Sequence, residues 1–200
     1  MTKATLPRSG RPRQHDLTRN ILDAALASLA DEGYEATTIA QVAQAARTSK
    51  QAIYRRWPNK EAMIAAAIEQ GFAAMTLSAP ERRSVSQDLL HCLGEIVTCL
   101  QETPLGNALK STIFMRNNVA LSRALHNANE HQRLILRQIL IATPFEVDME
   151  VKIDLLLGLP TSKIVIQGQK MTPEGLESAI EIVLGLTAPR APARAPVPFP

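Results

Sequence analysis

The chain has 200 residues, of which 46% are hydrophobic and 20% are charged. This length and composition suit one large folded domain, or a small domain joined to a larger one, and exclude a disordered chain. The apolar runs are much shorter than the roughly 18 residues that a transmembrane helix needs, and no apolar segment follows the basic N-terminus as in a signal peptide. We therefore expect a cytoplasmic protein.

The positive charge is concentrated near the N-terminus. Residues 1–60 hold ten Lys and Arg against five Asp and Glu, a balance of +5, whereas residues 61–200 hold 12 against 14, a balance of −2. Such an asymmetry predicts an anionic partner for the first segment, either nucleic acid or a membrane surface. A solvated basic face would give the same count.

The first 60 residues predict short helices. Apolar residues at helical spacing predict a helix over 16–32, and Gly33 follows it where a left-handed C-cap is expected. A capping-box pattern at Thr38 predicts a short second helix, and the same pattern at Thr48 predicts a third. Two short helices joined by a tight turn have the dimensions of a helix-turn-helix. A fourth helix should begin after Asn59.

The rest of the sequence predicts longer helices and no strand. Helical spacing indicates the segments 84–102, 104–115, 119–142, 146–167 and 172–186. Pro160 should kink the fourth of these. The predicted fold class is all-α, with about nine helices. Residues 188–200 contain five prolines and four alanines, which favours a disordered, polyproline-like tail.

Residues 37–61, TTIAQVAQAARTSKQAIYRRWPNKE, resemble the DNA-binding signature of the tetracycline-repressor (TetR) family. The paired Thr, the apolar-Ala step, the Ser/Thr cap, the Ile-Tyr pair and the Asn-Lys-Glu start of the next helix match in order and spacing. The resemblance implies a flexible basic arm over 1–15, a helix-turn-helix domain over 16–60 and a helical ligand-binding and dimerisation domain over 61–187. It implies a homodimeric transcriptional regulator, most often a repressor, that leaves a near-palindromic operator when a small molecule binds.

The turn departs from the family pattern, because Ala46-Arg47 stand where the family usually has Gly-Val. A left-handed residue would cost Ala about 1 kcal/mol relative to Gly, so we expect a slightly strained turn. Arg47 cannot fill the small core as Val does, and its charge can instead reach the DNA phosphates. Arg8, Arg11 and Arg13 belong to the basic arm, which either enters the minor groove or only adds charge attraction.

The third helix is expected to lie in a major groove, with its N-terminal residues at the base edges. Lys50 can donate to guanine and Gln51 can make a two-point contact with adenine, while Arg55 or Arg56 can reach guanine or the backbone. The other predicted DNA contacts, chiefly to phosphate, are Thr38, Arg47, Thr48, Ser49, Tyr54 and Lys60. Simpler interpretations stay open, since Tyr54 and Trp57 would be partly buried in any three-helix unit and the two arginines could be an ordinary solvated pair.

A small-molecule pocket is expected among the helices after residue 80. Gln132 interrupts the apolar stripe of the 119–142 helix, so its amide pairs within the protein, lies at a subunit interface or faces a ligand. The predicted pocket residues are Cys92, Ile96, Phe114, Met115, His131 and Gln132. Cys92 and Cys99 lie too far apart along one helix for a disulfide, so they are interpreted as packed thiols, with a redox or metal sensor as the alternative. The histidines lack zinc-site spacing, and no metal or cofactor is expected.

The last two helices are apolar over more than one face, which resembles the family's dimer interface, a four-helix bundle formed by two chains. The residues expected there are Leu155, Leu159, Ile164, Leu176, Ile180 and Val183. The implied partners are double-stranded DNA, a small-molecule effector and a second copy of the chain, with no membrane. No nucleophile-base pair or carboxylate pair stands at a recognisable spacing, so an enzyme is not expected. An architectural DNA-binding protein without an effector is the other alternative.

Overall fold

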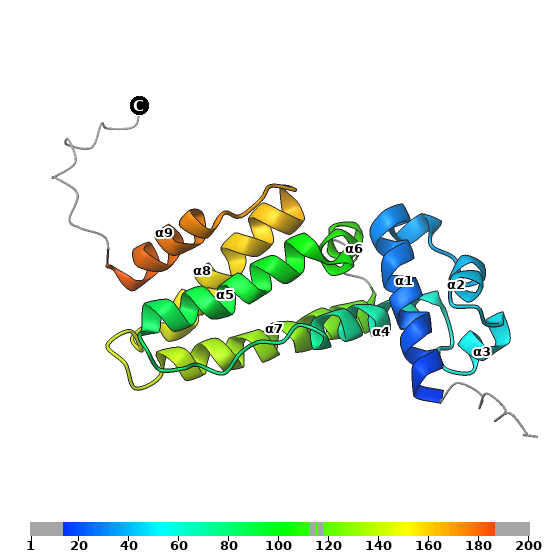
Figure 1. Ribbon diagram of the computed structural model, residues 1–200, viewed down its shortest axis with the longest axis horizontal. Helices are drawn as coiled ribbons and strands as arrows, with labels where there is room; N and C mark the ends of the chain where they lie inside the picture. Colours follow the sequence, from blue (N-terminus) through cyan, green and yellow to red (C-terminus); the bar gives the residue numbers. More distant parts are fainter. Residues whose placement is uncertain (1–13, 113–114, 116–117, 187–200) are drawn as a thin grey trace, which may run out of the picture. The chain divides into compact units, whose positions relative to one another are not determined.

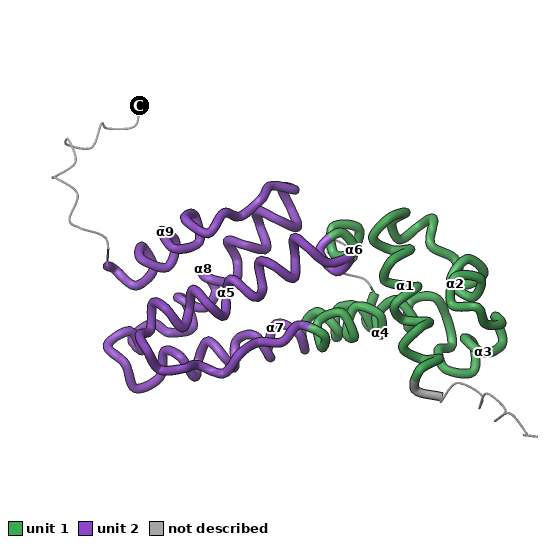
Figure 2. The backbone as a smooth tube through the Cα atoms, viewed as in Figure 1, with its two compact units in different colours: residues 1–74, 107–126 green, residues 75–106, 127–200 purple. Residues whose placement is uncertain are grey.

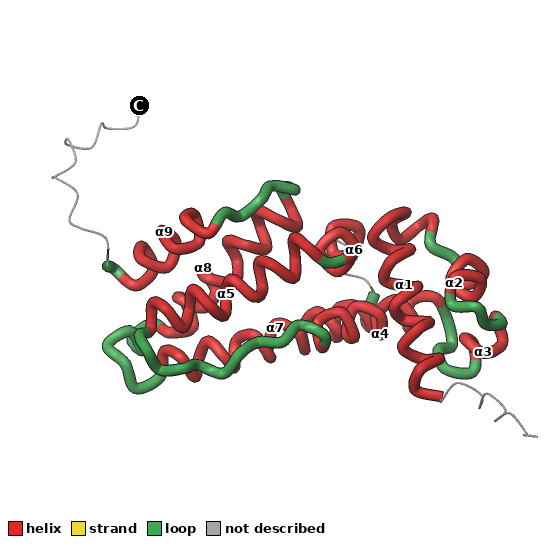
Figure 3. The backbone as a smooth tube through the Cα atoms, in the orientation of Figure 1, coloured by secondary structure: helices red, strands yellow, loops and turns green. Residues whose placement is uncertain are grey.

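The computed structural model describes residues 14–112, 115 and 118–186, and within these ranges it contains helices and no strand (Figure 3). The helices in chain order are α1 (Gln14–Ala36), α2 (Ile39–Ala45), α3 (Lys50–Tyr54), α4 (Lys60–Ala73), α5 (Val85–Glu102), α6 (Pro104–Thr112), α7 (Val119–Leu140), α8 (Met149–Pro160), the π-helical turn η1 (Thr161–Ile166) and α9 (Pro173–Leu184) (Figure 1). The predicted all-α fold class is confirmed. The predicted tail, and the predicted arm up to residue 13, lie outside the described residues.

Two compact units make up the chain (Figure 2). Unit 1 comprises residues 1–74 and 107–126, and unit 2 comprises residues 75–106 and 127–200. Helix α4, which the sequence assigns to the second domain, therefore belongs to unit 1 with the helix-turn-helix.

Helices α1 and α4 form the centre of unit 1. Ile21 and Leu29 of α1, and Met63 and Ile68 of α4, are fully buried. Burying one such side chain contributes roughly 1.5–3 kcal/mol relative to leaving it exposed. The packing of α4 on α1 therefore accounts for much of the stability of this unit, and the short helices α2 and α3 complete it.

Gly33 interrupts α1 near its end, with φ 79 and ψ 175. This region of backbone space is open almost only to glycine. The Gly33 carbonyl accepts hydrogen bonds from the backbone N–H of Thr37 at 3.2 Å and from its hydroxyl at 2.8 Å, and Thr37 is fully buried. Gly33 thus has the positive φ that was predicted, but its ψ is extended and it is not the C-cap, because the helix continues to Ala36 beyond the kink.

Polar caps begin the three helices that follow. Thr38 Oγ1 accepts from the backbone N–H of Gln41 at 3.2 Å, and Gln41 Oε1 accepts in return from the N–H of Thr38 at 3.0 Å, which completes the predicted capping box. Asn59 Oδ1 accepts a backbone N–H of α4 at 2.8 Å, also as expected. For α3 the sequence interpretation is off by one residue, because the cap is Ser49 and not Thr48.

The turn between α2 and α3 contains a left-handed residue at Arg47, with φ 51, whereas Ala46 has φ −77. The expected strain is therefore present, but it lies on Arg47 and not on Ala46. The backbone N–H of Arg47 donates to the Gln44 carbonyl at 3.1 Å, and that of Thr48 donates to the Ala43 carbonyl at 2.9 Å. These two bonds satisfy the last carbonyls of α2 and require the chain to reverse at Arg47.

In unit 2, α5 packs against both α8 and α9. Leu93 of α5, Ile153 of α8 and Ile180 of α9 are at most 1% exposed and form part of its core. Pro160 ends α8 and the wider π turn η1 follows, which is an irregularity expected where proline removes a helical hydrogen bond. Helix α9 ends at Leu184, two residues before the predicted end at Leu186, and Gly185, with φ 70, is its C-cap.

Candidate nucleic-acid interface

Helix α3 has one buried and one exposed side. Ala52 and Ile53 are at most 4% exposed and hold the helix in unit 1. Four polar side chains lie on the exposed side: Lys50, Gln51, Tyr54 and Arg55. None of the four forms a hydrogen bond or ion pair with the residues that the structure describes. They form the polar face of α3, which carries donors and acceptors but no partners for them within this part of the chain.

Tyr54 is the large aromatic residue of this face, and it is 53% exposed. A tyrosine that served only to pack unit 1 would be buried like Ile53 beside it. Trp57, by contrast, is half-buried. The two aromatic residues therefore differ as the sequence predicted: Tyr54 is accessible to a partner, whereas Trp57 is more enclosed.

The two arginines that follow α3 have different environments. Arg55 is exposed, whereas Arg56 is half-buried and its guanidinium forms two hydrogen bonds. Arg56 Nε donates to Thr18 Oγ1 of α1 at 3.0 Å, and Arg56 Nη1 donates to the Ala52 carbonyl at 2.8 Å. The sequence gives no sign of this difference and did not single out Thr18.

Lys60 is also engaged within unit 1. Its ammonium lies 4.2 Å from the centre of the Tyr34 ring, a cation–π contact, and it donates to the Glu35 carbonyl at 3.4 Å. The Tyr34 hydroxyl donates to Glu61 Oε1 at 3.3 Å. Burial and the nearby Glu61 carboxylate raise the pKa of Tyr34 to about 12. These contacts join the end of α1 to the start of α4, so the structure gives Lys60 a role besides the predicted phosphate contact.

The remaining predicted contacts lie at the start of α2 and in the turn between α2 and α3. Arg47 is exposed, and Ser49 Oγ accepts the cap hydrogen bond at 3.2 Å, which leaves its hydroxyl proton for an outside acceptor. Thr38 is exposed, but its hydroxyl donates to Gln41 Oε1 at 2.6 Å. Thr48 is half-buried. Arg47 and Ser49 are therefore the more available of these four side chains.

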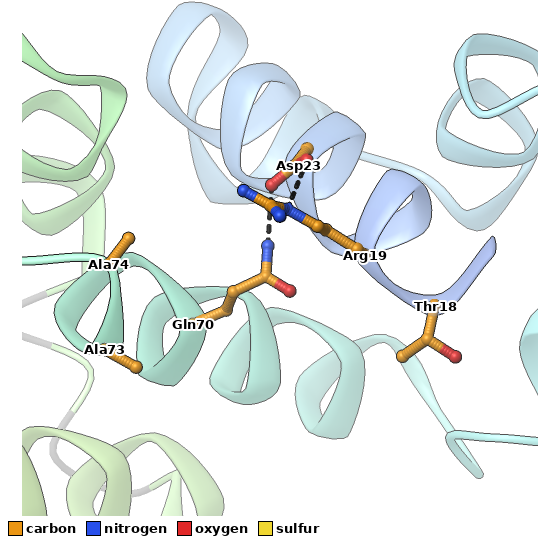
Figure 4. A pocket seen from close by; sticks show the side chains of 6 residues that line it. All are labelled: Thr18, Arg19, Asp23, Gln70, Ala73 and Ala74. Atoms are coloured by element: carbon orange, nitrogen blue, oxygen red, sulfur yellow. Dashed lines mark hydrogen bonds and ion pairs between the residues drawn. The ribbon is translucent and has the colours of Figure 1, made fainter. Parts of the chain in front are cut away.

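A groove of about 460 Å³ lies between α1 and α4 within unit 1 (Figure 4). Gln70 Nε2 of α4 donates to Asp23 Oδ1 of α1 at 2.6 Å, and Arg19 lies 3.9 Å from the same carboxylate. Thr18 lies at the same groove, on the first turns of α1. None of the predicted pocket residues lines this groove.

The predicted pocket residues have mixed environments. Cys92 and Ile96 are buried in unit 2, Gln132 is half-buried with its amide 4.0 Å from Met75 Sδ, and His131 is exposed. Met115 is half-buried in unit 1, and Phe114 lies outside the described residues. His131 lies on α7 between the exposed Glu130 and the half-buried Gln132, and its assignment to a pocket stays a prediction.

The two cysteines are free thiols. Burial raises the pKa of Cys92 to about 12, and burial also raises the pKa of Cys99. Because the thiolate is the reactive and metal-binding form, both environments favour an unreactive thiol at neutral pH. Among the residues that the structure describes, no three His, Cys, Asp or Glu side chains form a group that could hold a metal ion.

The predicted dimer residues divide into two sets. Ile164, Leu176 and Ile180 are at most 3% exposed and belong to the core of unit 2, and their place at a dimer interface stays a prediction. Leu155 is 55% exposed and Leu159 is 37% exposed, while Val183 is half-buried. The exposed apolar side chains of α8, α9 and the residue after Gly185 form what we term the apolar stripe: Val151, Leu155, Leu159, Ile182 and Leu186. The spacing of four residues along α8 could have revealed it.

Arg133 and Arg137 of α7 connect to α8 in unit 2 through carboxylates. Arg133 pairs with Glu150 and Asp154, and Arg137 Nε donates to Glu150 at 2.6 Å. These two guanidinium groups lower the pKa of Glu150 to about 2.

Among the described residues, no helix combines the length and apolar composition that crossing a bilayer requires.

Known proteins match this chain in both sequence and fold. Residues 21–67 match the family model described as bacterial regulatory proteins, tetR family. An uncharacterized HTH-type transcriptional regulator of Mycobacterium tuberculosis is 30% identical over 140 residues, which cover 69% of this chain and 66% of the relative. The match thus spans just under two thirds of that relative's length.

Solved structures share the fold at low identity. A tetR-family transcriptional regulator from Streptomyces coelicolor has a TM-score of 0.71 at 15% identity, over 89% of this chain and 82% of that one. The Flavonoid-responsive Regulator FrrA has a TM-score of 0.62 at 21% identity, over 86% of this chain and 95% of that one. At these identities the likeness concerns the arrangement of helices alone.

Proposed function

The chain belongs to the TetR family of bacterial transcriptional regulators, and we propose that it is a repressor that binds a near-palindromic DNA operator as a homodimer. The observation that carries this proposal is the polar face of α3. Four side chains that can bind bases or phosphates lie together on the exposed side of a helix whose other side is buried. A short helix held in this way is the element that helix-turn-helix proteins insert into a major groove.

The side chains of this face divide by chemistry. Lys50 and Gln51, in the first turn of α3, would read base edges, since Lys suits the guanine acceptors and Gln suits the two-point pattern of adenine. Tyr54 and Arg55 would bind phosphate and set the register, together with Arg47 in the preceding turn. Phosphate contacts of this kind make binding fall with rising salt, because each one releases counterions from DNA.

The apolar stripe on α8 and α9 supports a homodimer. Side chains such as Leu155 and Ile182, each more than half exposed, lie on two helices that pack against each other. Burying apolar surface of this kind contributes roughly 25 cal/mol per Å². A second copy is the natural partner, because a two-fold dimer would present two copies of α3 to successive major grooves.

A small molecule bound in unit 2 would release the operator if it favours a conformation in which the two copies of α3 are wrongly spaced. One protein with this fold is described as flavonoid-responsive. Buried apolar groups such as Ile96 and the half-buried amide of Gln132 would suit a largely apolar effector with a polar group.

Selection of bound sequences from random duplex DNA tests this function. We expect two half-sites whose centres are about one helical turn, or a multiple of it, apart. Lys50→Ala should lower the affinity for the selected site by roughly 1–3 kcal/mol, as expected for loss of a base contact, and Tyr54→Ala should lower it through loss of a phosphate contact. Lys170→Ala, which removes the same charge from an exposed position of unit 2, is the matched control. Unchanged affinity in both α3 variants would refute the assignment of α3 to DNA.

A further inference from the structure

Helix α3 is anchored by very little apolar surface. It has five residues, and its buried side chains are Ala52 and Ile53. Two adjacent side chains near the middle of a helix fix its position but restrain its orientation weakly. The polar face of α3 needs a defined orientation, because a displacement of about 1 Å is enough to lose a directional hydrogen bond.

The guanidinium of Arg56 restrains the C-terminal end of α3. In a regular α-helix the backbone N–H of Arg56 would donate to the Ala52 carbonyl. It donates instead to the Ile53 carbonyl at 2.8 Å, as the N–H of Trp57 does at 3.0 Å. The Ala52 carbonyl accepts from Arg56 Nη1 at 2.8 Å, so the side chain supplies the donor that the backbone no longer provides. A cation at this end of a helix is also favoured by the helix dipole.

The same guanidinium reaches α1. Arg56 Nε donates at 3.0 Å to the hydroxyl of Thr18, which lies 38 residues earlier in the chain, at the groove of Figure 4. Both side chains are half-buried. Because the guanidinium is planar and its donors are fixed relative to one another, the two bonds together define an angle between α3 and α1. Arg55, the next residue back, is exposed and makes no such bond within the described part of the chain.

We propose that Arg56 is a positioning residue for DNA reading: its bond to Thr18 fixes the orientation of α3 on α1 and so holds Lys50 and Gln51 at the base edges. Arg55 is the arginine that binds DNA directly. This proposal rests on the proposed DNA-binding function. It also changes the prediction from the sequence, which gave Arg55 and Arg56 the same role.

Four variants of the full chain separate positioning from direct contact: Arg56→Ala, Arg55→Ala, Thr18→Val and Thr18→Ser. The affinity of each is measured for the selected operator and for a random-sequence duplex over a range of salt concentrations. Arg56→Ala and Thr18→Val should each lower the ratio of specific to non-specific affinity by about tenfold, as expected for loss of a coupled pair. In both variants the slope of log affinity against log salt should stay nearly unchanged. A fifth variant that combines Arg56→Ala with Thr18→Val should lower the affinity ratio little further than either substitution alone.

Arg55→Ala should behave differently, lowering both affinities and reducing the slope of log affinity against log salt by about one. Thr18→Ser keeps the hydroxyl acceptor and should retain the wild-type ratio. The proposal is overturned if Arg56→Ala reduces the salt slope as Arg55→Ala does while the ratio is kept. It is overturned equally if Thr18→Val matches the wild type while Arg56→Ala loses specificity.

Amide hydrogen exchange supplies a measurement that needs no DNA. The backbone amides of residues 53–57 should exchange faster in Arg56→Ala and Thr18→Val than in the wild type, and at the wild-type rate in Arg55→Ala and Thr18→Ser. Unchanged exchange in Thr18→Val overturns the proposal. If Arg56→Ala fails to fold, the comparison of Thr18→Val with Thr18→Ser tests the proposal in both the DNA-binding and the exchange measurements. A wild-type chain that selects no DNA sequence would refute the proposed function, and the exchange rates would still decide whether the bond orients α3.

Discussion

Replacing Arg47 by glycine should stabilise this protein. Arg47 holds a left-handed conformation, φ 51, and its side chain is exposed, so no packing is lost. The left-handed region costs an L-residue roughly 1–2 kcal/mol. Glycine also has greater conformational freedom in the unfolded chain, which lowers the free energy of unfolding by about 0.4–1 kcal/mol. We therefore expect Arg47→Gly to raise the free energy of unfolding by about 0.5–1 kcal/mol and the melting temperature by about 1–4 °C.

Two controls locate the strain. Arg47→Ala removes the charge but keeps the side-chain carbon that clashes, so it should leave the free energy of unfolding near the wild-type value. Ala46→Gly places glycine where the family usually has it, but φ is −77 there, so we expect a loss of about 0.5–1 kcal/mol. Urea unfolding followed by circular dichroism, at one protein concentration, measures all three variants. If Ala46→Gly stabilised the chain and Arg47→Gly did not, the left-handed residue would be misassigned.

Three further predictions concern other parts of the fold. Arg137 and Arg133 lower the pKa of Glu150 to about 2. The contribution of Glu150 to stability is therefore present above its ordinary pKa near 4.5 and is lost as the pH falls toward 2. Between pH 7 and pH 2 the melting temperature of Glu150→Gln should fall less than that of the wild type. Gly33→Ala should cost roughly 1–3 kcal/mol in urea unfolding, because φ 79 with ψ 175 suits glycine, and wild-type stability would contradict this. Leu155→Glu should shift the sedimentation coefficient toward the monomer while the helical circular dichroism is retained, and an unchanged dimer would exclude the apolar stripe from the interface.

Local sequence patterns predicted the helices well where the signal is a short-range contact. The capping box at Thr38 and the cap at Asn59 were predictable, because each is formed by a side chain and an amide three residues away. The cap of α3 was misplaced because Thr48 and Ser49 are adjacent and chemically equivalent, and only the backbone of the turn selects between them. The strain was assigned to Ala46 for the same reason, since the family pattern marks the turn but not which of its residues takes the positive φ.

Apolar periodicity predicted which helices bury a face, but not what each face meets. Leu155 and Ile180 are both apolar residues of the last two predicted helices, and both were expected at a dimer interface. In the folded chain Ile180 is buried in the core of unit 2, and Leu155 is exposed. The difference arises from how α5, α8 and α9 pack together, and a hydropathy pattern contains no information about that packing.

The amino-acid sequence alone determined the all-α fold, the position of the helix-turn-helix and the basic character of its surface. These properties depend on residue type and on spacings of three or four positions, which the chain carries whatever its tertiary structure. The tertiary structure decided the rest: that the left-handed residue is Arg47, that the apolar stripe is distinct from the core, and that Arg55 and Arg56 have different environments. The last depends on Thr18, 38 residues away in sequence, and only the packing of α3 against α1 brings its hydroxyl within 3.0 Å of the Arg56 guanidinium.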